Sequence, residues 1–203
     1  MFELKDTTYS EFYTLAVEKL GLLTSNDLDT YSYSLKQNEP VKAIIYKILV
    51  DDIFTEIKKR TAYMARLRSG EASLLDIANM TSDDLQMFDP FIEEIAEEVA
   101  ERMRTLSRFI VPSFIYREEI DTYYTKDNFS YIIEQREWMT PQALKMIDTR
   151  LKETLTTGVM WKWFMYALPT EAEVYMNIYK ENLVRLSAVL NSSNPVKRRF
   201  IYF

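Results

Sequence analysis

Apolar residues recur every three or four positions along most of the chain, which is the spacing of one face of an α-helix. The pattern predicts long helices over residues 8–20, 40–68, 90–110, 141–168 and 170–190. A shorter helix is expected over residues 72–79 and a capped turn at 81–84, whereas residues 24–39 are polar and are expected to form a surface connection.

Several helix starts are marked by residue types that satisfy free backbone groups. Pro40, Pro90 and Pro141 suit a first helical turn, where the N–H that proline lacks would be unpaired, and Asp89 and Thr140 stand before two of them as caps. The last helix should begin with a capping box over residues 170–173, in which a threonine precedes a glutamate by three positions.

The segment from residue 112 to residue 139 is compatible with two structures. Its aromatic and β-branched residues fit a helix over residues 128–138 with Asp127 as the cap, which we favour. A small β-hairpin in the same segment is the main alternative.

The composition supports a helical fold. Three glycines in 203 residues is well below the roughly 7% of an average protein, and folds rich in strands and turns usually need more. We therefore predict an all-α fold, a bundle of about five to seven helices over residues 1–194, followed by an extended C-terminal arm at residues 195–203.

The last two predicted helices form a hairpin joined at residues 168–170. Residues 159–168 are apolar nearly all round, so they should be surrounded by other helices or by another subunit. The aromatic residues here could line a ligand pocket, but at helical spacing they are more typical of a core or a subunit interface. The predicted interface residues are Trp161, Trp163, Phe164 and Tyr166, and the inward-facing residues of the last helix are Val174, Tyr175, Ile178, Tyr179, Leu186, Val189 and Leu190.

The arm does not have the composition of a disordered tail, which is usually poor in aromatic and β-branched residues. Pro195 prevents the helix from continuing, so an extended segment that binds a partner through its apolar side chains and three cations is expected. Docking on another chain, docking on its own fold and disorder all remain open. The predicted partner-binding residues are Val196, Lys197, Arg198, Arg199, Phe200, Ile201, Tyr202 and Phe203.

Charge and missing residue types limit the chemistry. The chain has no cysteine and no histidine, which removes cysteine nucleophiles, serine–histidine triads and most zinc and di-iron sites, so we expect no catalytic residue, metal or cofactor. The net charge is −6, and without the three cations of the arm the body carries nine net negative charges. Such a body repels phosphate backbones, so nonspecific nucleic-acid binding by the fold is not expected, and no specific nucleic-acid binding is predicted. The longest strongly apolar run, residues 158–168, has 11 residues and contains Lys162, so it is too short to span a bilayer.

An acidic cluster lies within residues 93–101. Glu93, Glu97 and Glu101 stand one helical turn apart and could hold a divalent cation or support acid–base chemistry. Without a histidine to complete a di-metal motif, a solvated helix face is the favoured interpretation.

The C-terminal third resembles a known class of proteins. Its last helices carry Trp161-Lys162-Trp163-Phe164 and Glu171-Ala172-Glu173-Val174-Tyr175, and an arm containing Lys197-Arg198-Arg199-Phe200 follows. In this it is similar to the head-to-tail adaptor proteins of tailed bacteriophages, the head-completion or connector-ring proteins. The segment Glu18-Lys19-Leu20-Gly21-Leu22 is also similar to the start of some podovirus tail-accessory adaptors.

The resemblance implies a structural virion protein in a ring of about twelve copies. The arm would bind the portal protein, and the body would contact other tail or ring proteins in the neck of the virion, close to packaged DNA. Assembly would take place in the host cytoplasm. The alternative is a cytoplasmic helical regulatory module that binds a peptide or small ligand near Trp161 and Trp163.

Overall fold

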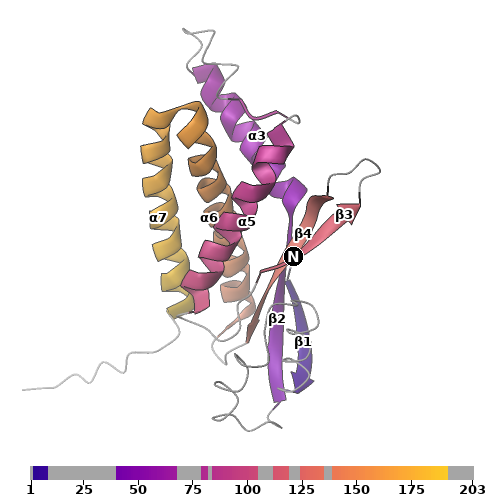
Figure 1. The fold of residues 1–203 in the computed structure, drawn as a ribbon. Coiled ribbons are helices and arrows are strands. Elements are labelled where there is room, and N and C mark those ends of the chain that lie inside the picture. The colour runs from indigo at the N-terminus through magenta and orange to yellow at the C-terminus, as the bar shows by residue number, and fades with distance from the viewer. Residues whose placement is uncertain are drawn as a thin grey trace, which may run out of the picture.

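The computed structural model describes residues 2–8, 40–67, 79–81, 84–104, 112–118, 124–134 and 139–191. Four α-helices stand on one side of the molecule and a four-stranded sheet on the other (Figure 1). The helices are α3 (Val50–Leu67), α5 (Leu85–Arg104), α6 (Pro141–Ala167) and α7 (Pro169–Asn191). The strands are β1 (Phe2–Thr8), β2 (Pro40–Leu49), β3 (Pro112–Glu118) and β4 (Tyr124–Glu134).

The sheet is antiparallel throughout, in the order β1-β2-β4-β3. Along its two central strands, buried side chains alternate with side chains that point away from the core, as a half-buried sheet requires. On β2 and β4 the paired residues Ile44 and Ile133, Tyr46 and Tyr131, and Ile48 and Phe129 are all fully buried, whereas Lys47 and Leu49 of β2 are exposed. One face of the sheet therefore forms the floor of the core.

Two buried tyrosines tie this sheet to the helices. Tyr131 donates a hydrogen bond from its hydroxyl to the carbonyl oxygen of Ala96 in α5 at 3.0 Å. Tyr46 reaches the carbonyl oxygen of Leu144 in α6 at 3.4 Å. Burial raises the pKa of both phenols, so they remain neutral donors.

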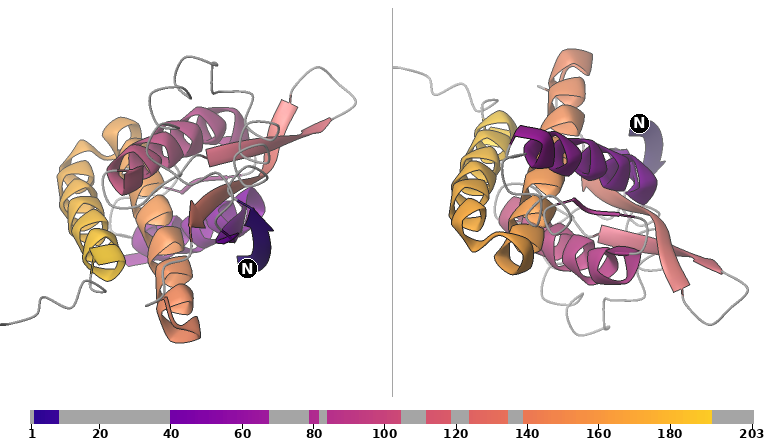
Figure 2. Two further views of the ribbon diagram at one scale, coloured as in Figure 1. Left: turned by 90° about the horizontal axis from the view of Figure 1, so that it is seen from below. Right: turned by 90° about the horizontal axis from the view of Figure 1, so that it is seen from above.

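Helix α6 is the central helix. Seen from below and above, it passes between α3 and α5, with α7 along a third side (Figure 2). Its middle is buried all round, over seven consecutive residues from Thr154 to Met160. The sequence predicted a stretch surrounded by other helices at residues 159–168. The structure contains such a stretch, but it lies earlier in the helix, at residues 154–160.

Gly158 is the point of closest approach within this arrangement. A Cβ atom placed on it would lie 2.6 Å from Cγ2 of Ile95 in α5 and 2.9 Å from Cε2 of Tyr179 in α7. Both distances are shorter than van der Waals contact. The missing side chain therefore lets two helices pack against α6 at the same level.

Several predicted boundaries are confirmed. The α6 start is one, because Thr140 is the N-cap, Pro141 opens the helix, and the Thr140 hydroxyl accepts the Ala143 N–H at 3.3 Å. The turn at 81–84 is another, with the Asp84 carboxylate accepting the Thr81 N–H at 2.7 Å. Helix α7 ends at Asn191, as expected.

The all-α prediction is only partly right, because the mainly helical fold includes the sheet. The predicted helix over residues 40–68 is wrong in its first ten residues, which form β2, and the favoured helix over 128–138 is wrong because the hairpin alternative, β3 and β4, forms instead. In both segments the buried residues alternate, and each strand gains partners far away in sequence.

Two helix starts also differ from the prediction. Helix α5 begins at Leu85, so Pro90 lies inside it. Helix α7 begins at Pro169 because the Leu168 carbonyl accepts the N–H groups of Glu171 and Ala172, which replaces the predicted capping box at 170–173.

Other predictions fall outside the described residues. These are the connection 24–39, the end of the third helix near residue 110, the arm 195–203, the helix 8–20 apart from Thr8, which ends β1, and the helix 72–79 apart from Asn79. The described part contains four helices, so the total of five to seven stays a prediction, as does the division into a domain and an arm.

Replacing Gly158 with alanine should destabilise the protein by about 1–3 kcal/mol, because the added methyl group overpacks the crossing. Without that crowding, the same change inside a helix would stabilise by about 0.8–1 kcal/mol. Urea denaturation would measure the difference. Combining Gly158→Ala with Ile95→Ala should cost less than the sum of the two single changes, whereas strict additivity would contradict the predicted clash.

Candidate interaction surface

The four aromatic residues predicted for a subunit interface have different environments. Trp163 and Phe164 are buried in the core of their own chain, with Phe164 packed on Tyr175 at a ring distance of 4.9 Å. Trp161 is half-buried and stacks on Tyr179 at 5.6 Å. Tyr166 keeps 68% of its surface exposed. Of these four side chains, Tyr166 therefore offers the most surface to a partner.

Tyr166 lies where α6 meets the first half of α5. Its ring stacks on Phe91 of α5 with centroids 5.7 Å apart. One turn away, Lys162 of α6 forms an ion pair with Glu94 of α5 and also lies 4.7 Å above the Trp161 ring. The edge between α5 and α6 is thus aromatic at Tyr166 and charged at Lys162.

Helix α7 presents a second apolar surface. The exposed fractions are 50% for Val174, 37% for Ile178 and 60% for Val184, and Met165 of α6 is 49% exposed. The prediction that Val174 and Ile178 face inward is wrong. The side of α7 that packs on the core is formed instead by Tyr179, Asn182 and Leu186, which are buried. Val174 and Ile178 are one turn apart, but their face of the helix continues into the exposed charged residues Glu181 and Arg185. The exposed apolar side chains of α7 are therefore interspersed with charged ones.

The outer side of α5 is acidic. Glu94, Glu97, Glu98 and Glu101 are exposed, as the favoured interpretation of a solvated face requires. In the described part of the chain, no group of three acidic side chains is arranged to hold a metal ion.

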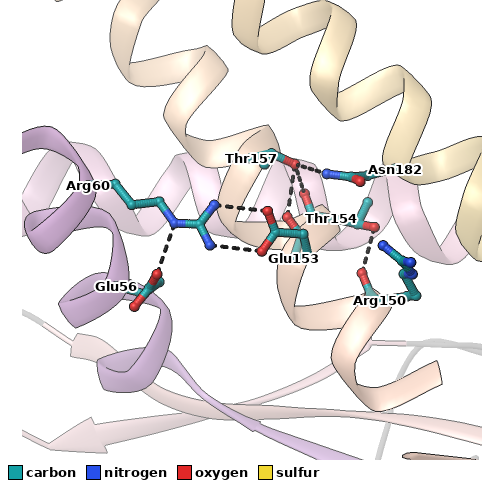
Figure 3. A network of polar contacts seen from close by, with 7 residues as sticks. All are labelled: Glu56, Arg60, Arg150, Glu153, Thr154, Thr157 and Asn182. Atoms are coloured by element: carbon teal, nitrogen blue, oxygen red, sulfur yellow. Dashed lines mark hydrogen bonds and ion pairs between the residues drawn. The ribbon is translucent and has the colours of Figure 1, made fainter. Parts of the chain in front are cut away.

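A polar network joins α3 to α6 (Figure 3). Arg60 donates two parallel hydrogen bonds to the Glu153 carboxylate, at 2.9 and 2.8 Å, and a third from Nε to Glu56 at 2.9 Å. A planar guanidinium matches a carboxylate best in this paired geometry. Because Arg60 and Glu153 are 93 positions apart, local sequence spacing gave no signal for the pair.

The same network continues into the α6–α7 hairpin. The hydroxyl of Thr157 donates to the carbonyl oxygen of Glu153 at 2.9 Å, and Asn182 of α7 donates to that hydroxyl at 3.2 Å. Thr157 and Asn182 are buried, so these bonds satisfy groups that would otherwise be costly to bury. The network aligns three helices and presents no activated nucleophile.

A surface hollow of about 460 Å³ lies along the first half of α6. It is lined by Gln142, Lys145, Met146, Thr149 and Arg150. Eleven helical steps, roughly 16 Å, lead from its last lining residue, Arg150, to Trp161. The hollow therefore does not coincide with the tryptophan pocket that the alternative hypothesis requires.

The predicted partner-binding residues 196–203 lie outside the described part of the chain. None of the described helices combines the length and apolar character needed to cross a lipid bilayer. No protein-family model, curated protein or solved structure matches the chain.

The ion pair between Arg60 and Glu153 makes the free energy of unfolding depend on pH. The hydrogen bonds from Arg60 hold the pKa of Glu153 below its usual value, so the stabilisation is present at neutral pH and is lost as the pH falls through that lowered pKa. Glu153→Gln should therefore cost about 1–2 kcal/mol at pH 7. The gap to the unchanged protein should begin to narrow as the pH falls below the ordinary glutamate pKa of 4.5 and should close once the pH is below the lowered pKa of Glu153.

Urea denaturation at several pH values would measure this dependence. The matched control is Glu56→Gln, which breaks the single bond within α3 and should cost only about 0.3–0.5 kcal/mol. An equal penalty for Glu153→Gln at pH 3 and pH 7 would contradict the assignment.

Proposed function

We propose that the chain is a structural virion protein that forms an adaptor ring between the portal and the tail of a bacteriophage, attached through its C-terminal arm. The observation that carries the proposal is the set of exposed apolar side chains on the α6–α7 hairpin, which precedes the apolar end of the chain in sequence. Val174, Ile178, Val184, Met165 and Tyr166 are each more than one third exposed.

The composition of this surface supports assembly with other proteins. Tyr166 and Met165 are exposed at the end of α6, and tyrosine and methionine are enriched in the centres of protein interfaces. The hairpin also rests on a packed core that fixes its outer face, with Phe164 and Tyr179 fully buried beneath it. A rigid platform of this kind loses little conformational entropy on assembly.

The charge distribution is compatible with a position around a DNA channel. The exposed side of α5 carries Glu94, Glu97, Glu98 and Glu101, which repel a phosphate backbone. Such a ring surrounds packaged DNA without gripping it. The partners are further copies of the chain in a ring of about twelve, the portal protein, and other tail or ring proteins, and the location is the neck of the virion.

The alternative, a cytoplasmic module with a ligand pocket around Trp161 and Trp163, has less support. Trp163 is 6% exposed and Trp161 is covered by Tyr179 on one side. A ligand would have to displace these contacts to reach either indole.

Deleting residues 195–203 tests the proposal. Because the arm lies beyond the last helix, far-UV circular dichroism should stay unchanged while binding to the portal protein of the same phage is lost. Binding would be measured by native mass spectrometry of the mixed proteins. A matched control replaces Lys197, Arg198 and Arg199 by glutamine, which keeps the length and apolar residues of the arm and should weaken binding less than deletion.

Portal binding that survives the deletion would contradict attachment through the arm. A full-length chain that stays monomeric and ignores the portal, while its tryptophan fluorescence responds to a peptide or small molecule, would favour the alternative module.

A further inference from the structure

The hollow on the outer side of α6 has a cationic rim. Figure 2 shows that the first turns of this helix extend beyond the other helices. Lys145 and Arg150 border the hollow and the exposed Met146 forms its apolar part. Within the described part of the chain, no acidic side chain forms an ion pair with either cation. The hollow therefore suits an apolar or aromatic group that has negative charge beside it.

An exposed aromatic ring lies near the other end of the same helix. Tyr166 has the highest exposed fraction of the large apolar side chains in the described part of the chain, 68%. Its ring is held in place by the stack on Phe91 of α5. The exposed Met165 follows it on the chain side nearer the core of α6, and the exposed Met87 lies one turn before Phe91 on α5. We call Met87, Met165 and Tyr166 the tyrosine corner.

The charge beside the tyrosine corner is negative. Glu94 lies about one turn after Phe91 and keeps 59% of its side chain exposed, whereas its partner Lys162 is only 16% exposed. The carboxylate of this ion pair therefore offers more surface to another molecule than the ammonium does. A tyrosine ring with a carboxylate nearby is complementary to a methionine-lined hollow with a cationic rim, through sulfur–aromatic, cation–π and ion-pair contacts.

Tyr63 of α3 is the competing exposed ring. It is 63% exposed, but Lys59 and Arg66, about one turn before and after it, are exposed cations. Like charges placed opposite each other disfavour association. The cationic hollow therefore repels the surroundings of Tyr63 and attracts those of Tyr166.

The hollow and the tyrosine corner cannot meet within one molecule. Met146 and Tyr166 are twenty helical steps apart on one continuous helix, roughly 30 Å. A contact between the two surfaces must therefore join two copies of the chain. Such a contact is heterologous, and heterologous contacts form a ring when the rotation between successive copies closes.

We propose that the tyrosine corner of one copy docks into the α6 hollow of the next copy. The inference rests on the proposed function for the existence of a ring and adds the contact that links its subunits. The Tyr166 ring packs on Met146, and Glu94 pairs with the cations of the rim. The C-terminal arm and the acidic second half of α5 take no part in this contact, so both keep the roles proposed above.

Cross-linking between copies tests the contact, because the natural chain contains no cysteine. Met165→Cys is introduced into a copy with a mass tag and Thr149→Cys into an untagged copy, and a short bismaleimide is added to the mixture. A product with the summed mass of both chains is expected. The matched control, Tyr63→Cys, should give at least about tenfold less product with Thr149→Cys.

A chain that carries both cysteines can be linked only to another copy. Thr149 and Met165 are sixteen helical steps apart, roughly 24 Å, which is farther than a short bismaleimide reaches. Linked copies are expected, and their yield should fall on dilution. Equal yields from the Met165→Cys and Tyr63→Cys copies would overturn the proposed contact.

An exchange of charge provides an independent measurement on the full chain. Tyr166→Arg keeps a planar group on Phe91 but brings a cation to the cationic hollow, so self-association in sedimentation should weaken by at least about tenfold. Adding Lys145→Glu and Thr149→Glu should restore it. Tyr63→Arg is the matched control and should leave self-association unchanged. Failure of the combined variant to recover, with circular dichroism intact, would overturn the proposed docking.

Failure of the inference differs from failure of the proposed function. A chain that binds the portal through its arm but gives no cross-link between positions 165 and 149, alone or on the portal, would overturn the inference and retain the adaptor. A chain that gives this cross-link but does not bind the portal would support the contact and contradict the adaptor. A chain that stays monomeric and ignores the portal would remove both.

Discussion

The fold depends on the absence of a side chain at Gly158. At this position α6 is in contact with Ile95 of α5 and Tyr179 of α7, closer than any side chain would allow. Packing density in protein interiors leaves no room for even one additional methyl group at such a point. Because α5 and α7 are fixed at the same level of α6, the residues above and below the crossing are brought into register, including the Trp161–Tyr179 and Phe91–Tyr166 stacks.

Polar contacts then determine which face of each helix packs against its neighbour. Apolar packing alone tolerates a rotation of one helix against another, whereas paired hydrogen bonds have one geometry. Arg60 joins α3 to α6 through Glu153, and Asn182 joins α7 to α6 through Thr157. The hydroxyl of Tyr131 joins the sheet to α5 through its hydrogen bond to the carbonyl oxygen of Ala96. Each layer of the molecule is therefore attached to the central helices by at least one directional bond.

How much of this could be predicted from sequence depends on whether the cause is local. The start of α6 was predictable because Thr140 and Pro141 act within one turn. The first ten residues of the helix predicted over 40–68 form β2, since Ile44, Ile45 and Ile48 fit either a helix face or a strand, and the decision comes from β4, more than eighty positions away. The packed side of α7 was largely predictable, because Tyr179, Leu186 and Leu190 are buried as expected, and only Val174 and Ile178, which stand next to that row in sequence, are exposed instead.

The exposed side chains of α7 are then a consequence of how its packed side is placed. Among the described elements α7 packs mainly on α6, so with Tyr175, Tyr179 and Asn182 turned toward the core, Val174, Ile178 and Val184 are left exposed. Burying apolar surface contributes about 25 cal/mol per Å², and a chain that leaves such residues exposed forgoes that stabilisation until something covers them. The same packing that holds the helices together thus also leaves these apolar side chains of α7 exposed.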